Sequence, residues 1–157
     1  IGIDGNPIIS YSDETNGSLK VAACTDTACT TTPTPITVDT GTLLMAWYTS
    51  IAIGADGNPI ISYYDATNGD LKVAACTNPT CTDTPTFTIV DNTGDSTGDV
   101  GWFASITIGV DGNPVISYYD NSDVDDGDLK VAKITRTSWT PNNWEAKPTT
   151  LTTTRPE

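Results

Sequence analysis

Short runs of apolar and β-branched residues alternate with turn sequences along the chain, and this pattern predicts an all-β protein. In the middle of the chain the runs are WYTSIAI at 47–53, PIISYYD at 59–65, LKVAAC at 71–76 and TFTIVD at 86–91. Between them, ADGN and ATNG carry the Asp-Gly and Asn-Gly pairs that favour tight hairpin turns. We therefore expect a four-stranded antiparallel meander, and no segment has the periodicity of a helix.

The same pattern occurs three times. DGNPIISYSDETNGSLKVAAC begins at Asp4, DGNPIISYYDATNGDLKVAAC at Asp56 and DGNPVISYYDNSDVDDGDLKVAK at Asp111. The chain divides into repeat 1 at 1–46, repeat 2 at 47–101, repeat 3 at 102–147, and a Thr/Pro-rich linker or strand-closing tail at 148–157. Repeat 1 lacks the sequence that precedes IAIG and ITIG in the later copies, so we expect an N-terminally incomplete unit in a processed or partial chain.

Adjacent apolar positions within the strands, such as Ile60 and Ile61, predict that both faces of each sheet are covered. Small sheets that stack in series without helices are typical of a β-propeller. The stretch TSIAIGADGNPIISYYDATNGDLKVA resembles the blade repeat of bacterial and archaeal extracellular β-propeller proteins, loosely related to the sialidase-like and kelch-like propellers. The resemblance implies three four-stranded antiparallel blades. Typical propellers have about 4 to 8 blades, so we expect a partial or open propeller, or part of a larger ring completed by further repeats or other copies.

The charge of the chain excludes several classes of partner. Seven basic and twenty acidic residues give a net charge of −13, which repels the phosphate backbone of nucleic acids and anionic membrane surfaces. The apolar runs fall far short of the roughly 20 residues that span a bilayer. We therefore expect neither nucleic-acid binding nor membrane insertion.

The four cysteines form two pairs of identical spacing, Cys24 with Cys29 and Cys76 with Cys81. This arrangement favours two disulfides and a secreted or cell-surface location. Zinc is the alternative, but the CxxxxC spacing and the absence of histidine fit it poorly. In repeat 3, Ile134 and Trp139 take the cysteine positions, and an apolar pair can replace a disulfide but not a metal ligand.

We expect no catalytic residue in the chain. Without histidine, Ser-His-Asp and Cys-His arrangements are excluded. Sialidase-like catalysis, by family resemblance, implies three arginines around a carboxylate, and this chain has only Arg136 and Arg155. The sialidase Asp-box is also absent, which leaves accessory blades of a larger sialidase-like hydrolase as one alternative. Paired carboxylates for glycoside hydrolysis remain open, although most acidic residues fall in turns.

An acidic loop in repeat 3 is the candidate metal site. Hard cations such as calcium favour oxygen-rich loops, and one ion would relieve the repulsion among the carboxylates. The spacing is not that of an EF-hand, and a solvated acidic loop is the simpler interpretation. A second and weaker candidate comprises Asp91, Asp95 and Asp99. The residues of the first candidate are Asp120, Asp123, Asp125, Asp126 and Asp128; we expect no other cofactor.

Recurring aromatic residues are the candidate carbohydrate contacts. Exposed rings with polar neighbours bind sugars, and a repeated groove would be multivalent. Because the rings recur in each repeat, packing between neighbouring repeats is the simpler interpretation. The candidate residues are Trp47, Tyr48, Trp102, Phe103, Tyr64 and Tyr119.

Threonine-rich segments and one sequon predict candidate glycosylation sites. The segments combine Thr and Pro as O-glycosylated stalks do, although Thr also simply favours strands. The candidate residues are Asn16, Thr30, Thr31, Thr32, Thr152, Thr153 and Thr154.

Taken together, the sequence predicts a non-enzymatic, acidic, disulfide-containing extracellular module. The expected role is structural or adhesive, as a scaffold or as a subunit of a surface assembly such as a filament, whose partners are further repeats or other copies of the chain. The alternative is a multivalent, lectin-like module that binds glycans.

Overall fold

The computed structural model describes residues 1–40, 46–92, 99–122, 127–136 and 144–151. Its eleven strands form three antiparallel sheets, and these described residues contain no helix, so none that could cross a membrane. The all-β prediction is confirmed. The first sheet contains β1 (Ile8–Asp13), β2 (Ser18–Ala23) and β3 (Ile36–Thr40); the second contains β4 (Ala46–Ile53), β5 (Pro59–Asp65), β6 (Asp70–Ala75) and β7 (Thr86–Asp91); the third contains β8 (Val100–Ile108), β9 (Pro114–Asp120), β10 (Asp128–Arg136) and β11 (Trp144–Leu151).

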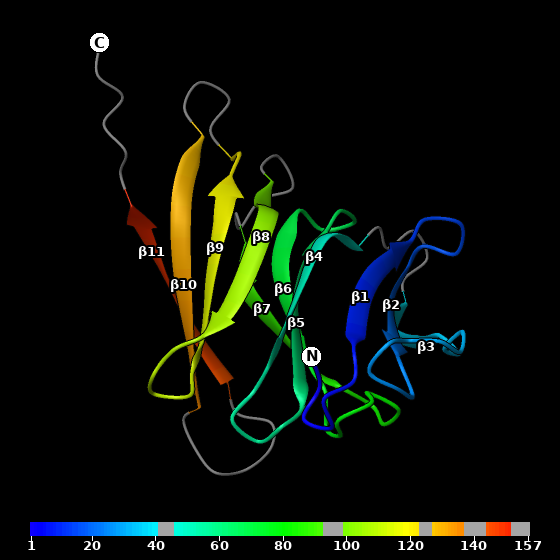
Figure 1. The fold of residues 1–157 in the computed structure, drawn as a ribbon. Coiled ribbons are helices and arrows are strands. Elements are labelled where there is room, and N and C mark those ends of the chain that lie inside the picture. The colour runs from blue at the N-terminus through cyan, green and yellow to red at the C-terminus, as the bar shows by residue number, and fades with distance from the viewer. Residues whose placement is uncertain (41–45, 93–98, 123–126, 137–143, 152–157) are drawn as a thin grey trace.

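Strands that follow one another in sequence are neighbours in each sheet. The second and third sheets have the expected four strands, whereas the first has three among the described residues, because β1 pairs only with β2. Residues 148–151 of the tail lie in β11. Figure 1 shows the sheets side by side in chain order, the first in blue and the third in yellow to red.

The turn sequences end the strands as their chemistry requires. In the second repeat, Gly54 N–H donates to Asn58 O at 2.8 Å, and Gly57 has a φ of +82°, which only glycine adopts without strain. Pro59 is the first residue of β5. The predicted ranges 59–65 and 86–91 are the observed strands β5 and β7, and β6 begins one residue before the prediction.

Two apolar cores lie between successive sheets. In the first core, Leu19 and Val21 of the first sheet are fully buried together with Ile61 of the second. In the second core, Leu71 of the second sheet packs with Ile116 of the third, both 0% exposed. At each junction the two sheets cover one another's apolar faces, so no helix is needed to cover these faces.

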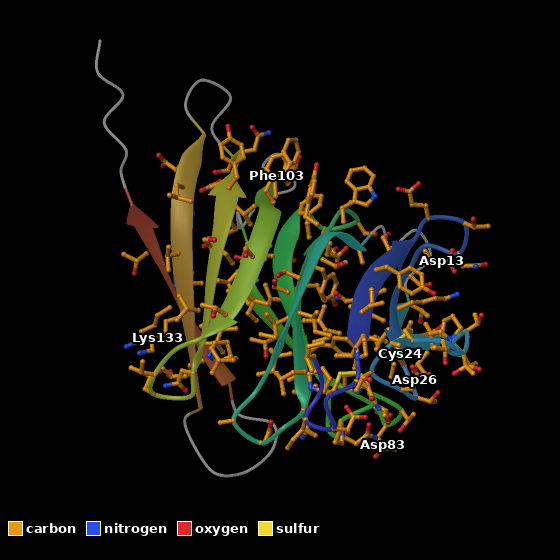
Figure 2. The ribbon with its side chains drawn as sticks, viewed as in Figure 1. Asp13, Cys24, Asp26, Asp83, Phe103 and Lys133 are labelled. Carbon is orange, nitrogen blue, oxygen red and sulfur yellow. A yellow bond between two sulfur atoms is a disulfide. The ribbon has the colours of Figure 1, made fainter. Side chains whose placement is uncertain are left out.

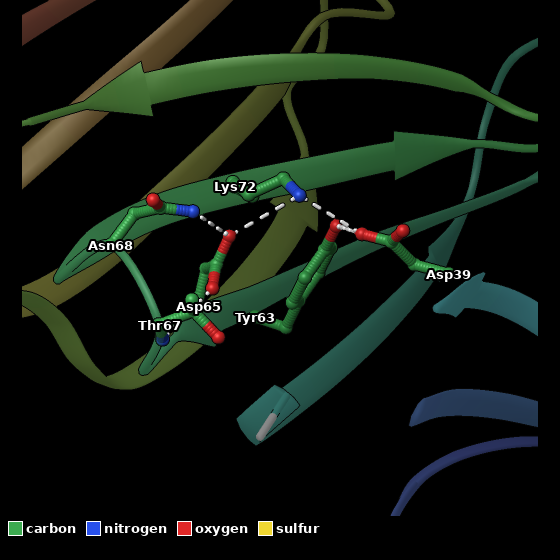
Figure 3. Close-up of polar contacts among 6 residues, drawn as sticks. All are labelled: Asp39, Tyr63, Asp65, Thr67, Asn68 and Lys72. Atoms are coloured by element: carbon green, nitrogen blue, oxygen red, sulfur yellow. Dashed lines mark hydrogen bonds and ion pairs between the residues drawn. The ribbon is translucent and has the colours of Figure 1, made fainter. Parts of the chain in front are cut away.

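A polar contact between an aspartate, a tyrosine and a lysine, which we call the clasp, occurs at each of the two junctions between sheets. Asp39 of β3 accepts a hydrogen bond of 2.5 Å from the Tyr63 hydroxyl and pairs with Lys72 at 2.9 Å (Figure 3). The same lysine also pairs with Asp65 at the end of β5, at 3.3 Å. The contact is part-buried, so it orients the two sheets more strongly than an exposed ion pair would.

The second junction repeats the clasp. Asp91 of β7 accepts a hydrogen bond of 2.6 Å from Tyr118 and pairs with Lys130 at 3.2 Å. Lys130 also pairs with Asp120 at 2.6 Å. Burial, followed by the hydrogen bonds to these aspartates, raises the pKa of both clasp tyrosines, Tyr63 and Tyr118.

Both predicted disulfides, Cys24–Cys29 and Cys76–Cys81, are present, and no cysteine is free among the described residues. Cys76 and Cys81 belong to the core between the first and second sheets. In the third repeat Ile134, at the position of the first cysteine, is 1% exposed; Trp139 lies outside the described residues.

Candidate functional site

The six predicted aromatic residues form one connected row at the end of the molecule where Phe103 is labelled in Figure 2. Within the second sheet Trp47 lies 6.3 Å from Tyr64, centroid to centroid. Within the third sheet Trp102 lies 6.5 Å from Tyr119. The two sheets are linked by Tyr48, whose ring is 4.6 Å from that of Phe103 and 6.3 Å from that of Trp102. The rings pack across the junction between the sheets, as the packing interpretation expects. Some of them also remain exposed, as contact with a carbohydrate requires.

Two members of this aromatic row are held in a strained backbone conformation. Tyr48 and Phe103 each have a φ of 54°, where an L-residue pays a steric cost. Each follows a tryptophan at an irregularity in the pairing of the first and second strands of its sheet. The irregularity turns the ring outward, so that Tyr48 is 36% and Phe103 64% exposed. Such a conformation persists only where the surrounding structure holds it, and the half-cystines Cys29 and Cys81 share it in the two disulfide loops.

An open groove of about 560 Å³ continues the aromatic row onto the first sheet. Trp47 and Tyr48 supply its aromatic wall, and Thr49 joins the two sheets by a hydrogen bond of 3.2 Å from the Ser10 hydroxyl. The Ser12 hydroxyl is buried without a hydrogen-bond partner among the described residues. The full lining is Ser10, Tyr11, Ser12, Glu14, Ala46, Trp47, Tyr48 and Thr49.

The groove differs from the other junction because Ser12 stands where the later repeats have Tyr64 and Tyr119. The smaller side chain leaves space beside Trp47. In the second sheet the Tyr64 hydroxyl instead donates to Asp99 at 2.6 Å, and burial, followed by this hydrogen bond, raises the pKa of Tyr64 to about 12. Tyr64 is thus a neutral, hydrogen-bonded support for the rings around it.

The electrostatic character of the groove is acidic and hydroxyl-rich. Among the described residues that line it, Glu14 alone is charged, and none of them is a lysine or an arginine. The exposed Glu14 carboxylate can accept hydrogen bonds beside the two exposed rings, and the unpaired Ser12 hydroxyl is buried beneath the surface of the groove. The arrangement can therefore bind a small neutral or cationic molecule that has both an apolar face and hydroxyl groups.

The acidic loop is only partly described. Asp123, Asp125 and Asp126 lie outside the described residues, while Asp120 is buried and paired with Lys130. The Asp120 pKa is lowered: burial opposes the shift, and the bonds from Lys130 and Ser122 outweigh it. No group of three metal-ligating side chains occurs in the described part of the chain, and calcium stays a prediction. In the weaker candidate, Asp91 belongs to a clasp and Asp95 lies outside the described residues.

The candidate glycosylation residues lie in exposed turns where the structure describes them. Asn16 donates its side-chain amide to Asp13 at 2.8 Å, and Thr30 donates its hydroxyl to Asp26 at 2.7 Å. Thr31 shares a hydrogen bond with Thr25, and Thr32 is exposed. Residues 152–154 lie outside the described part, and glycosylation at all seven sites stays a prediction.

Sequence reasoning missed the polar half of the groove and both clasps. Ser10, Ser12 and Glu14 are ordinary strand and turn residues, and the sequence signal for the groove is the serine at position 12 in place of the tyrosine of the later repeats. The signals for the clasp in the sequence are the Val-Asp pairs at 38–39 and 90–91, together with the lysine of LKVA.

Comparison with known proteins adds little to the assignment. No family model matches the chain, and no curated protein matches it. Among solved structures, a fucose lectin from Kordia zhangzhouensis in complex with methyl-fucoside is similar, with a TM-score of 0.49 and 14% identity over 96% of each chain.

Proposed function

We propose that the protein is a non-enzymatic, extracellular carbohydrate-binding module built of propeller-type blades, and that the groove between β1 and β4 is its sugar site. The observation that carries the proposal is the pairing of exposed, backbone-strained aromatic rings with a hydroxyl-lined groove. Such a pairing matches a sugar ring, which has an apolar C–H face and a rim of hydroxyls.

The division of labour within the groove follows from its residues. Trp47 and Tyr48 supply the aromatic face, and rigid rings of this kind contribute contact area at low entropic cost. Glu14 supplies an exposed acceptor, whereas the unpaired Ser12 Oγ is buried and would gain a partner only after the groove opens enough for a sugar hydroxyl or a bridging water to reach it. A sugar bound here would therefore contact both the aromatic wall and the polar side of the groove.

Charge narrows the class of sugar. The Glu14 carboxylate, the absence of basic lining residues and the net charge of −13 all disfavour sialylated or uronic-acid glycans. Neutral sugars and amino sugars are the ligands that fit. The aromatic row extends to Phe103 and Tyr119, so a longer glycan would find further contacts along it.

The disulfides support the extracellular part of the proposal. Two disulfides form and persist in oxidising compartments. A scaffold or adhesin role is the second candidate, and the observation that favours it is the clasp, which repeats at both junctions as an assembly contact would.

The test is a glycan array followed by calorimetric titration with the strongest neutral ligand. We expect the intact protein to bind neutral or amino-sugar glycans and to ignore sialylated ones. Trp47→Ala should weaken binding at least about tenfold, since one aromatic contact contributes about 0.5–1.5 kcal/mol beyond the area that it buries. Phe87→Ala is the matched control, because Phe87 is also exposed (41%) but lies in β7 outside the row.

Two results would count against this function. One is the absence of binding to every neutral and amino-sugar glycan by protein whose circular dichroism and thermal transition are those of the folded chain. The other is equal loss of binding in Trp47→Ala and Phe87→Ala, which would place the sugar elsewhere.

A further inference from the structure

Each sheet presents the same face toward the sheet that precedes it, and on the first sheet this face, which we call the open face, is exposed. At the internal junctions the face is buried: Ile61 and Ile116 are both 0% exposed, and Tyr63 and Tyr118 are at most 1%. The equivalent residue on β1, Ile9, is 49% exposed, and Tyr11 is half-buried. Burying Ile9 and Tyr11 as their equivalents are buried would remove substantial apolar area from water.

The open face also carries most of a clasp. Lys20 is ion-paired with Asp13, as Lys72 is with Asp65 and Lys130 with Asp120. At the internal junctions the lysine and tyrosine share a second carboxylate, Asp39 or Asp91, from the neighbouring sheet. No described residue supplies that carboxylate to Tyr11 and Lys20. The open face therefore lacks one specific chemical group.

The strand edge beside the open face is unpaired as well. In the second and third sheets the equivalents of β1, which are β5 and β9, have a strand on each side. β1 has only β2, and the apolar residues Ile1 and Ile3, 76% and 67% exposed, precede it. An unpaired edge offers backbone hydrogen bonds to an added strand.

We propose that the open face binds a further antiparallel sheet of the same type, whose last strand carries a Val-Asp pair near its C-terminal end, as β3 and β7 do. The required sequence signature is the TVD of residues 37–39 or the IVD of residues 89–91. Its aspartate would accept from Tyr11 and pair with Lys20, and its apolar face would cover Ile9. The inference does not depend on sugar binding, although Tyr11 of the open face is also one of the residues that line the groove.

The third sheet of a second copy is a poorer occupant than such a sheet. Asp39 lies opposite Leu19 in the first sheet, and Asp91 lies opposite Leu71 in the second. In the third sheet the residue opposite Leu129 is Leu151. Head-to-tail docking of copies would therefore leave Tyr11 and Lys20 without their carboxylate.

The experiment extends the whole chain at its N-terminus by a copy of residues 46–107 joined to Ile1. This join keeps the natural register, because Ile1-Gly2 corresponds to Ile108-Gly109. The measurement is the nitration rate of Tyr11 by tetranitromethane, read by peptide mass spectrometry in the extended and the original chain. We expect the added sheet to slow nitration at least about tenfold, the ratio that corresponds to about 1.4 kcal/mol of protection.

Matched substitutions in the added copy test the aspartate itself. Asp91→Asn in the copy should restore most of the Tyr11 nitration rate, whereas Asp83→Asn, an equal charge change in an exposed loop, should leave the protection intact. An extended chain that folds cooperatively but nitrates at the original rate would overturn the proposal. So would equal effects of the two substitutions.

A second variant guards against failure of the extended chain to fold. Leu151→Asp in the original chain supplies a carboxylate at the matching register of the third sheet, and sedimentation velocity should show association at least about tenfold tighter than that of the original chain. Adding Lys20→Met should abolish this gain. Strong association of the original chain with Tyr11 already protected would make a second copy the occupant and overturn the inference, as would the absence of any gain in Leu151→Asp.

Discussion

At the scale of single residues, the candidate site depends on two side chains that occupy an unfavourable backbone conformation. Tyr48 and Phe103 share a φ of 54° and contact each other across the junction at 4.6 Å. The left-handed conformation costs an L-residue about 1–2 kcal/mol relative to glycine. Both residues adopt this unfavourable conformation in the folded chain, and their rings are exposed to solvent.

This strain yields a prediction at position 48. Tyr48→Gly should be more stable than Tyr48→Ala by about 1 kcal/mol, because glycine adopts a positive φ without the Cβ clash. Both variants should lose sugar affinity equally, since both lack the ring. Urea unfolding and calorimetric titration of the two variants measure these effects. Equal stability of the two would show that the backbone relaxes on truncation, and the argument from strain would fail.

At the scale of elements, the two disulfides close loops of the same length but have different surroundings. Each links cysteines five residues apart. Cys24 and Cys76 are equally buried, at 5% and 6% exposed, but Cys81 is 1% exposed within the core between the first two sheets, whereas Cys29 is only half-buried. The second disulfide therefore closes a loop and also packs in the apolar core between the first two sheets.

We expect the two disulfides to differ in their contribution to stability. Replacing Cys24 and Cys29 by alanine should lower the free energy of unfolding by about 2 kcal/mol, the loop-closure value for so short a loop. Replacing Cys76 and Cys81 should cost about 1 kcal/mol more, because buried sulfur contacts are also lost. Urea titration without reductant measures both. A larger loss from the first pair would contradict the assignment of the second to the core.

At the scale of the whole molecule, stability resides in the junctions between sheets. Both apolar cores draw their residues from two successive sheets, and both clasps cross the same boundaries. A repeat architecture of this kind is stabilised mainly by nearest-neighbour interfaces. Conditions that weaken the clasps should therefore weaken the whole chain.

Alkaline pH is such a condition. The pKa of Tyr63 and that of Tyr118 are raised by burial, so above the ordinary value of about 10 the unfolded chain loses these protons while the folded chain keeps them. The stabilisation that these raised pKa values give the folded chain is complete below about pH 10. The free energy of unfolding should fall as the pH rises further, by about 1.4 kcal/mol per pH unit for each tyrosine. Unfolding in urea between pH 8 and 11 measures the slope, and Tyr63→Phe should reduce it by one tyrosine. An unchanged slope in this variant would contradict the assignment.

Much of the fold could be predicted from sequence because its turns are encoded locally. Asp-Gly and Asn-Gly pairs and the strand-opening Pro59 located β5 to the residue, and the β-branched run TFTIVD located β7. The groove could not be predicted, because it depends on Ser10, Ser12 and Trp47 meeting across two sheets and on an irregularity that rotates Tyr48 outward. The aromatic residues were identified by their recurrence, but recurrence alone could not show that their rings connect across the junction.

The repeated clasp has a consequence for inheritance. Since the interlocking residues recur at both junctions and the repeats share nearly identical stretches such as DGNPIISY, unequal crossing-over between the corresponding gene segments would add or remove a whole unit in frame. Each recombinant would retain a tyrosine, a lysine and an aspartate at every new boundary. Genes of this type should therefore vary in unit number more readily than in the residues at the boundaries, and alleles of different length would encode folded proteins without compensating mutations.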